Sequence, residues 1–231
     1  MGHSAPLGPG SARAFTGVTP PILFVSNRLI IVDKPAGLPV YPGRAGGPSI
    51  EDFFTLWAHG KTGPWAAHRL DQDTAGCLVI ALKKSALLAA QALFASGGAE
   101  KTYWALVRGN FRQTSGVIDQ PLAKQTIARH WKMVPDAKAP PAITEWDLKG
   151  QGANIAWLEL HPKTGRTHQI RAHCAALGHP IIGDAVYGGG HGPLCLLARH
   201  IHLPLDPPAA ATAPVPSHML SLMRECGYDQ K

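Results

Sequence analysis

Short apolar runs separated by turn residues constrain the fold of this chain most strongly. The runs are rich in Val, Ile and Leu and end at Gly, Pro, Asn or Asp, which is typical of strands. We expect strands at residues 22–25, 29–35, 76–82, 101–109, 142–148, 155–160 and 194–203. Helical spacing over longer stretches occurs at residues 85–96 and 166–180. Strands therefore outnumber helices without regular alternation, which predicts an α+β domain and not a doubly wound fold.

Turn and cap residues define the expected ends of these elements. The residues SNR at 26–28 predict a hairpin between the first two strands, and Pro35 ends its second strand. Ser49 is expected to cap a short helix, and Ser85 to cap the helix that Gly97 ends.

Composition shifts divide the chain into three parts. Residues 1–20 are rich in Gly, Pro, Ser and Ala, so we expect a flexible arm there. Residues 21–205 are expected to form the main folded domain. Residues 206–231 are expected to form a Pro/Ala-rich linker at 206–217 and a short amphipathic helix at 218–226.

The charge balance favours a polyanionic partner. The chain has 231 residues, with 22 Lys plus Arg against 15 Asp plus Glu, and a formal net charge of +7. Its four cysteines show no paired spacing, which favours reduced thiols. The sequence shows no signal-peptide h-region and no membrane-length apolar run, so we expect a soluble cytoplasmic protein without a membrane partner. It shows no surplus apolar element that would need a partner, so we also expect a monomer.

A first polar cluster, HRLDQDTAG at residues 68–76, directly precedes an apolar strand. A loop supported by a rigid strand can hold reactive groups at the surface of a core. The alternative is an Asx-type turn, in which Asp71 or Asp73 caps backbone N–H groups.

A second polar cluster, HPKTGRTHQIR at residues 161–171, passes from a strand into a helix. Backbone donors at that helix N-terminus, with Arg166 and Arg171 nearby, would suit an anion. The alternative is a helix whose exposed face carries Arg and His.

Metal binding, nucleotide hydrolysis, dinucleotide redox chemistry and serine esterase chemistry all lack their usual sequence motifs. His161, His168, His173 and His179 are grouped in the C-terminal half, but no H-E-x-x-H or zinc-spaced cysteine pair accompanies them. We therefore expect no metal site. The sequence also contains no Walker A loop, no G-x-G-x-x-G fingerprint and no G-x-S-x-G elbow.

Four segments, in order, resemble the motifs of the RluA-type family of pseudouridine synthases. They are LIIVDKPAGLPVYP at 29–42, HRLDQDTAG at 68–76, EKTYWALVRG at 100–109, and residues 160–188, which contain GRTHQIR and end GDAVYG. The resemblance covers about residues 22–205 and implies a mixed, mostly antiparallel sheet with flanking helices and an active-site cleft. The chain is similar to compact members that lack an S4 domain. Gln72 stands where the family often has Arg, and Ala75 where it usually has Ser.

The resemblance implies isomerisation of uridine in RNA without a cofactor. Asp71 would be the nucleophile, and Arg166 would pair with it and orient its carboxylate. Tyr103 would stack on the base and help to remove the C5 proton, although the local pattern by itself favours a tyrosine packed in the core. The three attack routes, at C1′, at C6 or through a glycal, all use the same carboxylate.

RNA, and not DNA, is the expected partner, with stem loops of rRNA or tRNA as substrates because their bases are easily unstacked. Arg69 would help to extrude the base or hold its phosphate. The full set of expected substrate-binding residues is His68, Arg69, Lys34, Lys101, Lys163, His168, Gln169 and Arg171.

Two other functions remain as alternatives. One is a catalytically inactive RNA-binding or ribosome-assembly factor on the same scaffold, against which the presence of Asp71, Tyr103 and Arg166 argues. The other is a metal-dependent hydrolase that uses the histidine-rich half of the chain.

Overall fold

The computed structural model describes residues 18–43, 46–58, 62–127 and 130–229. Most of the expected arm at 1–20 lies outside these ranges. The strands are β1 (Ile22–Val25), β2 (Leu29–Lys34), β3 (Trp65–Ala66), β4 (Ala75–Ala81), β5 (Glu100–Arg108), β6 (Ser115–Asp119), β7 (Leu122–Ile127), β8 (His130–Pro135), β9 (Ile143–Gln151), β10 (Ile155–Pro162), β11 (Leu196–Leu203) and β12 (Ala209–Thr212). The helices are η1 (Ile50–Phe53), a 3-10 helix, followed by α1 (Phe54–Trp57), α2 (Lys84–Ser96), α3 (Gln169–Ala176) and α4 (Ser217–Glu225).

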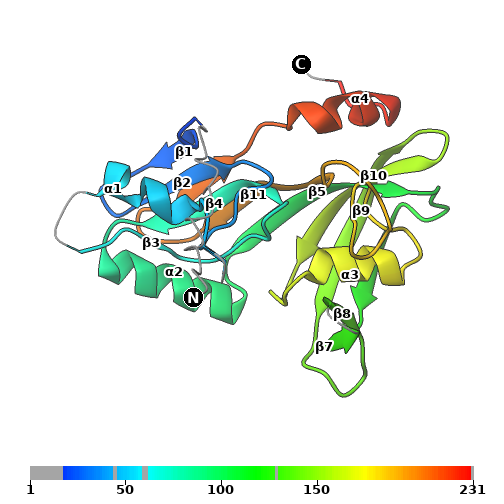
Figure 1. The fold of residues 1–231 in the computed structure, drawn as a ribbon, viewed down its shortest axis with the longest axis horizontal. Helices are drawn as coiled ribbons and strands as arrows, with labels where there is room; N and C mark the ends of the chain where they lie inside the picture. The colour runs from blue at the N-terminus through cyan, green and yellow to red at the C-terminus, as the bar shows by residue number, and fades with distance from the viewer. Residues whose placement is uncertain (1–17, 44–45, 59–61, 128–129, 230–231) are drawn as a thin grey trace, which may run out of the picture.

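A ten-stranded sheet is the main feature of the described residues (Figure 1). Its central path runs β1-β2-β4-β11-β5-β10-β9-β6, with β3 beside β4 and β12 beside β11. The contact between β11 and β4 is parallel, and the other strand pairs are antiparallel. The sheet is therefore mixed and mostly antiparallel, and the predicted α+β class is confirmed.

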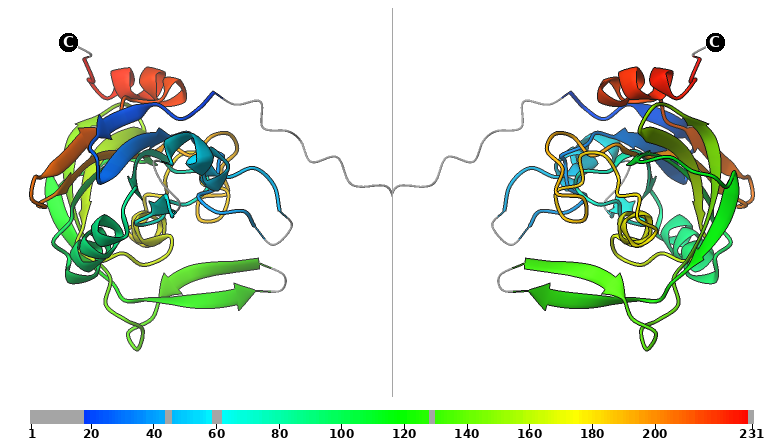
Figure 2. Two further views of the ribbon diagram at one scale, coloured as in Figure 1. Left: turned by 90° about the vertical axis from the view of Figure 1, so that its left-hand side faces the viewer. Right: turned by 90° about the vertical axis from the view of Figure 1, so that its right-hand side faces the viewer.

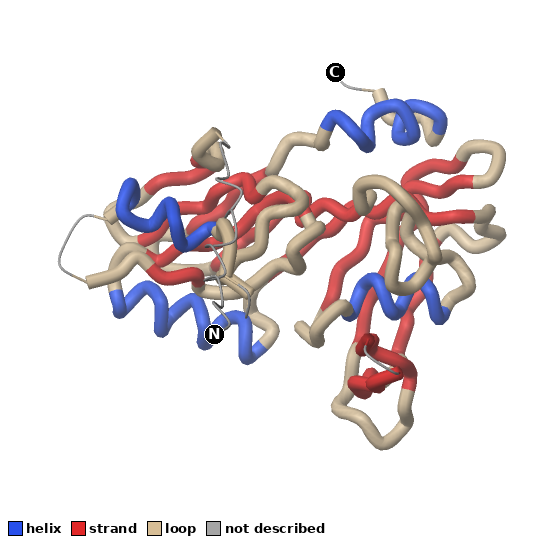
Figure 3. The backbone as a smooth tube through the Cα atoms, viewed as in Figure 1, coloured by secondary structure: helices blue, strands red, loops and turns tan. Residues whose placement is uncertain are grey.

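Helices cover both faces of this sheet (Figure 3). Helices α2 and α3 lie on one side of it and α4 on the other. Strand β4 is buried along its whole length, because both its faces are covered. The separate β7–β8 hairpin stands away from the sheet, below α3 (Figure 2).

Two expected helix starts are wrong. Helix α2 begins at Lys84 with Lys83 at its N-cap, because the Leu87 N–H already bonds the Lys83 carbonyl at 3.0 Å. Ser85 therefore lies in the first turn. Helix α3 begins at Gln169 and not at Arg166, and this shift changes which side chains enter the site.

The expected linker at 206–217 is also wrong in part. Residues 209–212 form β12, which pairs antiparallel with β11 and buries Ala209 and Ala211 on one face. Alanine-rich composition indicated a linker, but small side chains also fit a strand that lies close to a packed core. The amphipathic C-terminal helix is confirmed: α4 buries Met219 and Met223 completely. No helix in the described part of the chain has the length and hydropathy of a membrane span.

Candidate active site

The first polar cluster forms the loop between β3 and β4. Asp71 starts a tight turn, in which its carbonyl accepts the Thr74 N–H at 3.1 Å. Gly76 follows with a φ of +108°, and any Cβ there would collide with the Ala198 carbonyl of β11. Only glycine suits this backbone and this close approach, so Gly76 determines how the loop meets the sheet.

This loop faces the second polar cluster across a cavity of about 330 Å³. Strand β5 contributes Lys101 and Tyr103, because alternate residues of a strand point to the same side. The loop before α3 and its first turn contribute the opposite wall. Among the residues that line the cavity are Arg69, Asp71, Lys101, Tyr103, Arg166, His168 and Arg171. The structure thus brings most of the expected site residues together.

Arg171 pairs with Asp71 and with a second carboxylate, that of Asp184. Its Nη1 lies 3.3 Å from Asp71 Oδ2, while its Nε and Nη2 bond the two oxygens of Asp184 at 2.8 and 2.9 Å. Asp184 is 1% exposed and also accepts the N–H groups of Val186 and Tyr187. Burial alone would raise the pKa of Asp184, but the hydrogen bonds and charge of Arg171 lower it below its ordinary value. The anchored guanidinium can therefore hold the Asp71 carboxylate in one orientation.

The expected pairing of Arg166 with Asp71 is wrong. Arg166 is exposed, and its Nε donates to the Pro141 carbonyl at 3.0 Å. The reason is the late start of α3, since Arg166 lies in the preceding turn and Arg171 in the buried face of the helix. Arg171 is 6% exposed, so its expected role as a contact for the RNA backbone is also corrected.

His168 lies next to Asp71 in a left-handed conformation, with a φ of 51°. Its Nε2 is 3.8 Å from Asp71 Oδ2, and its Nδ1 is 3.2 Å from the Tyr187 hydroxyl. Burial lowers the pKa of His168 despite the opposing charge of Asp71, which favours a neutral imidazole at neutral pH. His168 therefore forms part of the wall beside the carboxylate.

Tyr103 stands on the floor of the cavity. Burial first, and the negative charge of Asp71 second, raise the pKa of its hydroxyl well above the ordinary value of 10.0. A phenol in this state keeps its proton at neutral pH and is a poor base. Its ring remains suited to stacking on a planar base.

Lys34 lies in the core and not on the surface, so its expected contact with RNA is wrong. It is fully buried, and its ammonium donates to the carbonyls of Pro35, Leu38 and Gln72 at 2.8–2.9 Å. Burial lowers the pKa of Lys34 to about 7 in spite of the nearby charges of Asp73 and Asp71. Lys34 thus ties the first motif to the backbone beside Asp71. The Gln72 amide adds a bond to the Gly37 carbonyl at 3.1 Å.

Two more expected substrate-binding residues are held by the protein itself. Gln169 is buried and bonds Thr164, Thr144, the Arg166 N–H and the Ile143 carbonyl. These bonds fix the turn before α3 and leave the amide little capacity for substrate. The His68 Nε2 accepts the Val79 N–H at 3.0 Å, and burial lowers the pKa of His68 to about 3.

The three remaining residues expected to bind RNA differ in whether they line the cavity. Lys101 and Arg69 line the cavity, and burial lowers the pKa of Lys101. Lys163 is half exposed and pairs with Glu145 at 2.7 Å, and it is not among the residues that line the cavity. The roles of Lys101 and Arg69 toward RNA stay predictions.

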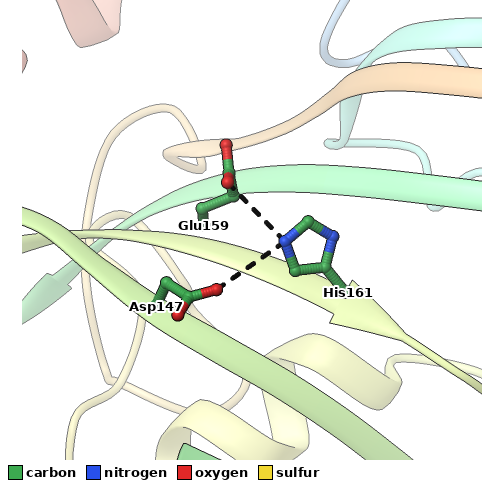
Figure 4. A group of neighbouring side chains, drawn as sticks. All are labelled: Asp147, Glu159 and His161. Atoms are coloured by element: carbon green, nitrogen blue, oxygen red, sulfur yellow. Dashed lines mark ion pairs between the residues drawn. The ribbon is translucent and has the colours of Figure 1, made fainter. Parts of the chain in front are cut away.

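A second group of ionisable side chains comes from β9 and β10 (Figure 4). Leu160 pairs with Tyr103 in the register of β10 and β5, so its neighbours Glu159 and His161 point to the face opposite the cavity. His161 Nε2 is 3.6 Å from Glu159 Oε1 and 3.9 Å from Asp147 Oδ2. Glu159 also pairs with Lys149 at 3.6 Å and accepts the Trp104 indole N–H at 2.9 Å. Lys149 and the Trp104 indole are thus partners of Glu159, and the contact of Asp147 in this group is with the His161 imidazole.

The four histidines considered for a metal site do not meet. His173 bonds Thr144 and the Gln120 carbonyl, and His179 bonds the Arg108 carbonyl. His161 lies on the far face of the sheet and His168 beside Asp71.

Asp184 and Tyr187 are not among the site residues expected from the sequence. Both lie in GDAVYG, the end of the fourth motif, so the signal was present. The structure shows what each residue contacts: Asp184 anchors Arg171, and the Tyr187 hydroxyl meets His168.

Comparison with known proteins identifies the family. Residues 28–176 match the family model described as RNA pseudouridylate synthase. The chain belongs to the RNA pseudouridine synthase family. An uncharacterized RNA pseudouridine synthase of Zymomonas mobilis is 39% identical over 170 residues, which cover 72% of this chain and 78% of that protein. The ribosomal large subunit pseudouridine synthase D of the same organism is 34% identical over 177 residues, 72% of this chain and 55% of that protein.

Solved structures agree with this pseudouridine synthase assignment. Human RNA pseudouridylate synthase domain containing 4 has a TM-score of 0.76 at 25% identity, over 90% of this chain and 94% of that chain. Human RNA pseudouridylate synthase domain containing 1 has a TM-score of 0.72 at 26% identity, over 90% of this chain and 86% of that chain. The protein is thus an isomerase that converts uridine to pseudouridine in RNA.

Proposed function

We propose that this synthase modifies uridines in stem loops of rRNA or tRNA, with Asp71 as its nucleophile and without a cofactor. The observation that carries the proposal is the position of Asp71: a partly exposed carboxylate in the cavity wall, oriented by Arg171, which Asp184 anchors in turn. A preorganised carboxylate of this kind suits covalent catalysis.

The reaction needs no electron or group from outside. The bond from N1 to C1′ breaks, the uracil turns, and C5 joins C1′. The proton that leaves C5 is balanced by the proton that N1 gains. Since substrate and product are isomers, the protein has to supply a nucleophile, a closed pocket for the detached base, and proton transfer. Attack at C1′, attack at C6 and abstraction of a sugar proton all begin from the same carboxylate.

Tyr103 would stack on the detached uracil while that base rotates. Its ring borders the cavity, and its raised pKa leaves the hydroxyl as a hydrogen-bond donor and not as a base. This differs from the expectation that Tyr103 also removes the C5 proton.

Arg69, Arg166 and Lys101 would bind phosphates around the cavity. Arg69 and Arg166 are exposed at its edge, and Lys101 extends from β5 into it.

Extrusion of a base costs least in a loop that is already poorly stacked, which favours stem loops. The name of the relative from Zymomonas mobilis, a ribosomal large subunit synthase, supports rRNA as the first substrate to test. We also propose that the protein acts as a monomer in the cytoplasm.

Mapping of pseudouridine tests this proposal. Purified protein is incubated in EDTA with unmodified rRNA and, separately, with unmodified tRNA transcripts, and carbodiimide-dependent stops are read by primer extension. We expect a new stop in one of these RNAs. RNA binding without any new stop would contradict the proposal and favour the inactive RNA-binding or assembly factor. Activity abolished by EDTA would contradict the cofactor-free mechanism.

A further inference from the structure

Trp131 is an exposed aromatic residue beside the active-site cavity, and the mechanism above does not use it. It lies in β8, and 40% of it is exposed. Its ring stacks on the His168 imidazole with centroids 4.9 Å apart and an angle of 27° between the planes. Because His168 Nε2 lies 3.8 Å from Asp71 Oδ2, a single imidazole separates Trp131 from the proposed nucleophile.

Fixed contacts hold Trp131 in this place. Two residues along β8, the Met133 N–H donates to the Tyr187 hydroxyl at 2.9 Å, and the same hydroxyl meets His168 Nδ1 at 3.2 Å. The base of the hairpin packs on α3 through a small apolar cluster of Leu122, Ala142 and Ala172, with Met133 and Tyr187 at its side. The β7–β8 hairpin is thus attached to the wall of the site, and its Trp131 is presented at the rim.

A cation accompanies this ring. The Lys124 ammonium lies 4.6 Å from the centre of the Trp131 ring. In the register of the hairpin, Lys124 faces Met133 and Thr126 faces Trp131, so Lys124 and Trp131 share one face of the ribbon. An aromatic surface with a cation beside it is the combination that binds one base and its phosphate in single-stranded nucleic acid.

The size of the cavity places the neighbouring nucleotides outside it. At about 330 Å³ it is at the small end of ligand pockets, which suits a single extruded nucleoside. The nucleotides on either side of that nucleoside must then lie at the rim.

We propose that Trp131 stacks on a nucleotide adjacent to the target uridine, while Lys124 neutralises the phosphate of that nucleotide. This inference rests on the proposed function, because it takes the cavity as the site of the target uridine. It makes Trp131 and Lys124 determinants of affinity and of sequence context around the uridine, separate from the chemical step.

Affinity and rate are measured together to test this inference. The probe for binding is an RNA stem loop whose loop contains only uridines, and the substrate for kinetics is the RNA found by mapping. Trp131→Ala should raise Kd and KM by about 5- to 150-fold, the range expected for loss of one base–aromatic stack, with kcat within about threefold of wild type. Trp131→Phe should restore most of the affinity, since a phenyl ring still stacks.

A matched pair of lysine variants controls for loss of charge. Lys84 lies over the Trp65 ring at 5.6 Å, as Lys124 lies over Trp131, but of these two rings it is Trp131 that stacks on a residue of the cavity wall, His168. We expect Lys124→Ala to weaken binding of the stem loop severalfold and Lys84→Ala to leave it nearly unchanged. Equal losses in the two variants would contradict the role of Lys124.

Fluorescence gives a direct measure of stacking. The emission of wild-type protein should be quenched on titration with the stem loop, and Trp131→Phe should remove most of that change. Unchanged affinity in Trp131→Ala, or a fall in kcat that Trp131→Phe does not rescue, would overturn the inference. An inactive wild type would overturn only the proposed function, because the comparison of affinities does not depend on activity.

Discussion

Arg171 is the residue on which the geometry of the site depends most. Its fork bridges Asp71 and Asp184, and an ammonium cannot make both contacts at once. We expect Arg171→Lys to lower the single-turnover rate by at least about 100-fold, the size of effect that misplaced catalytic groups produce, with RNA affinity within several-fold of wild type. Arg166→Lys is the matched control and should retain most of the single-turnover rate. A larger loss of single-turnover rate in Arg166→Lys than in Arg171→Lys would contradict this account and favour Arg166 as the partner of Asp71.

Lys34 gives the stability of the protein a defined dependence on pH. Its pKa is about 7 in the folded protein and would return to the ordinary 10.5 on unfolding. Between these values the unfolded chain binds more protons, so stability rises with pH. Relative to Lys34→Met, which cannot titrate, the wild-type free energy of unfolding should increase by about 2 kcal/mol from pH 7 to pH 9. Denaturant unfolding at both pH values measures this. If the difference in free energy of unfolding between wild type and Lys34→Met did not change with pH, the lowered pKa of Lys34 would be contradicted.

The placing of Asp71 and Tyr103 in the cavity could be predicted from the sequence, because each lies in a motif whose spacing is local. The choice between Arg166 and Arg171 could not be made in the same way. It depends on where α3 begins, and that start is determined by the left-handed His168 and by the buried hydrogen bonds of Gln169. The burial of Lys34 escapes a reading of the sequence for a related reason: two of its carbonyl acceptors, Pro35 and Leu38, are local, but the third, Gln72, meets Lys34 only in the folded chain.

At the scale of elements, α4 covers the face of the sheet opposite the active site. Tyr228, just beyond this helix, meets Trp104 and Trp157 edge to face at 5.8 and 5.4 Å. Met223 of α4 is 0% exposed, so Met223→Ala should lower the free energy of unfolding by about 2–4 kcal/mol through lost burial and the cavity left behind. Ser221→Ala, on the exposed side of the same helix, should change it by less than about 0.5 kcal/mol. Equal values for the two variants in urea unfolding would show that α4 is not packed.

The strands were easier to predict than the ends of the helices and the C-terminal segment. Residues 76–82 and 155–160 are runs of apolar residues between turn signals, and they form β4 and most of β10. Strand β12 carries no such signal, because four residues of Ala and Thr become a strand only when β11 offers free backbone groups beside them. Its existence is a property of tertiary packing and not of local propensity.

For the whole molecule, the charge of +7 should make RNA binding sensitive to salt. Each phosphate that is neutralised releases counterions, so affinity falls as the salt concentration rises. Between 50 and 200 mM salt we expect the affinity for the uridine stem loop to fall by at least about tenfold, which corresponds to about two phosphate contacts. Filter binding or fluorescence titration measures this. An affinity independent of salt would contradict the placing of Arg69, Arg166 and Lys101 against phosphates.

The fold joins two clusters that are about a hundred residues apart in sequence. Asp71 comes from the loop before β4 and Arg171 from α3, and the cavity forms where these segments meet beside β5. The resemblance of the ordered motifs indicates this meeting, whereas composition and the pattern of apolar runs indicate only a basic α+β protein. Trp131 lay outside every motif, and its place beside His168 depends on how the β7–β8 hairpin packs on α3.

The central claim is that the Asp71 carboxylate carries the reaction. Wild type and Asp71→Asn are compared at saturating protein on the same RNA, with pseudouridine counted by mass spectrometry and affinity measured in the same samples. The account predicts no detectable pseudouridine with Asp71→Asn and an RNA affinity within several-fold of wild type. Pseudouridine formed by Asp71→Asn at a rate comparable to wild type would contradict it.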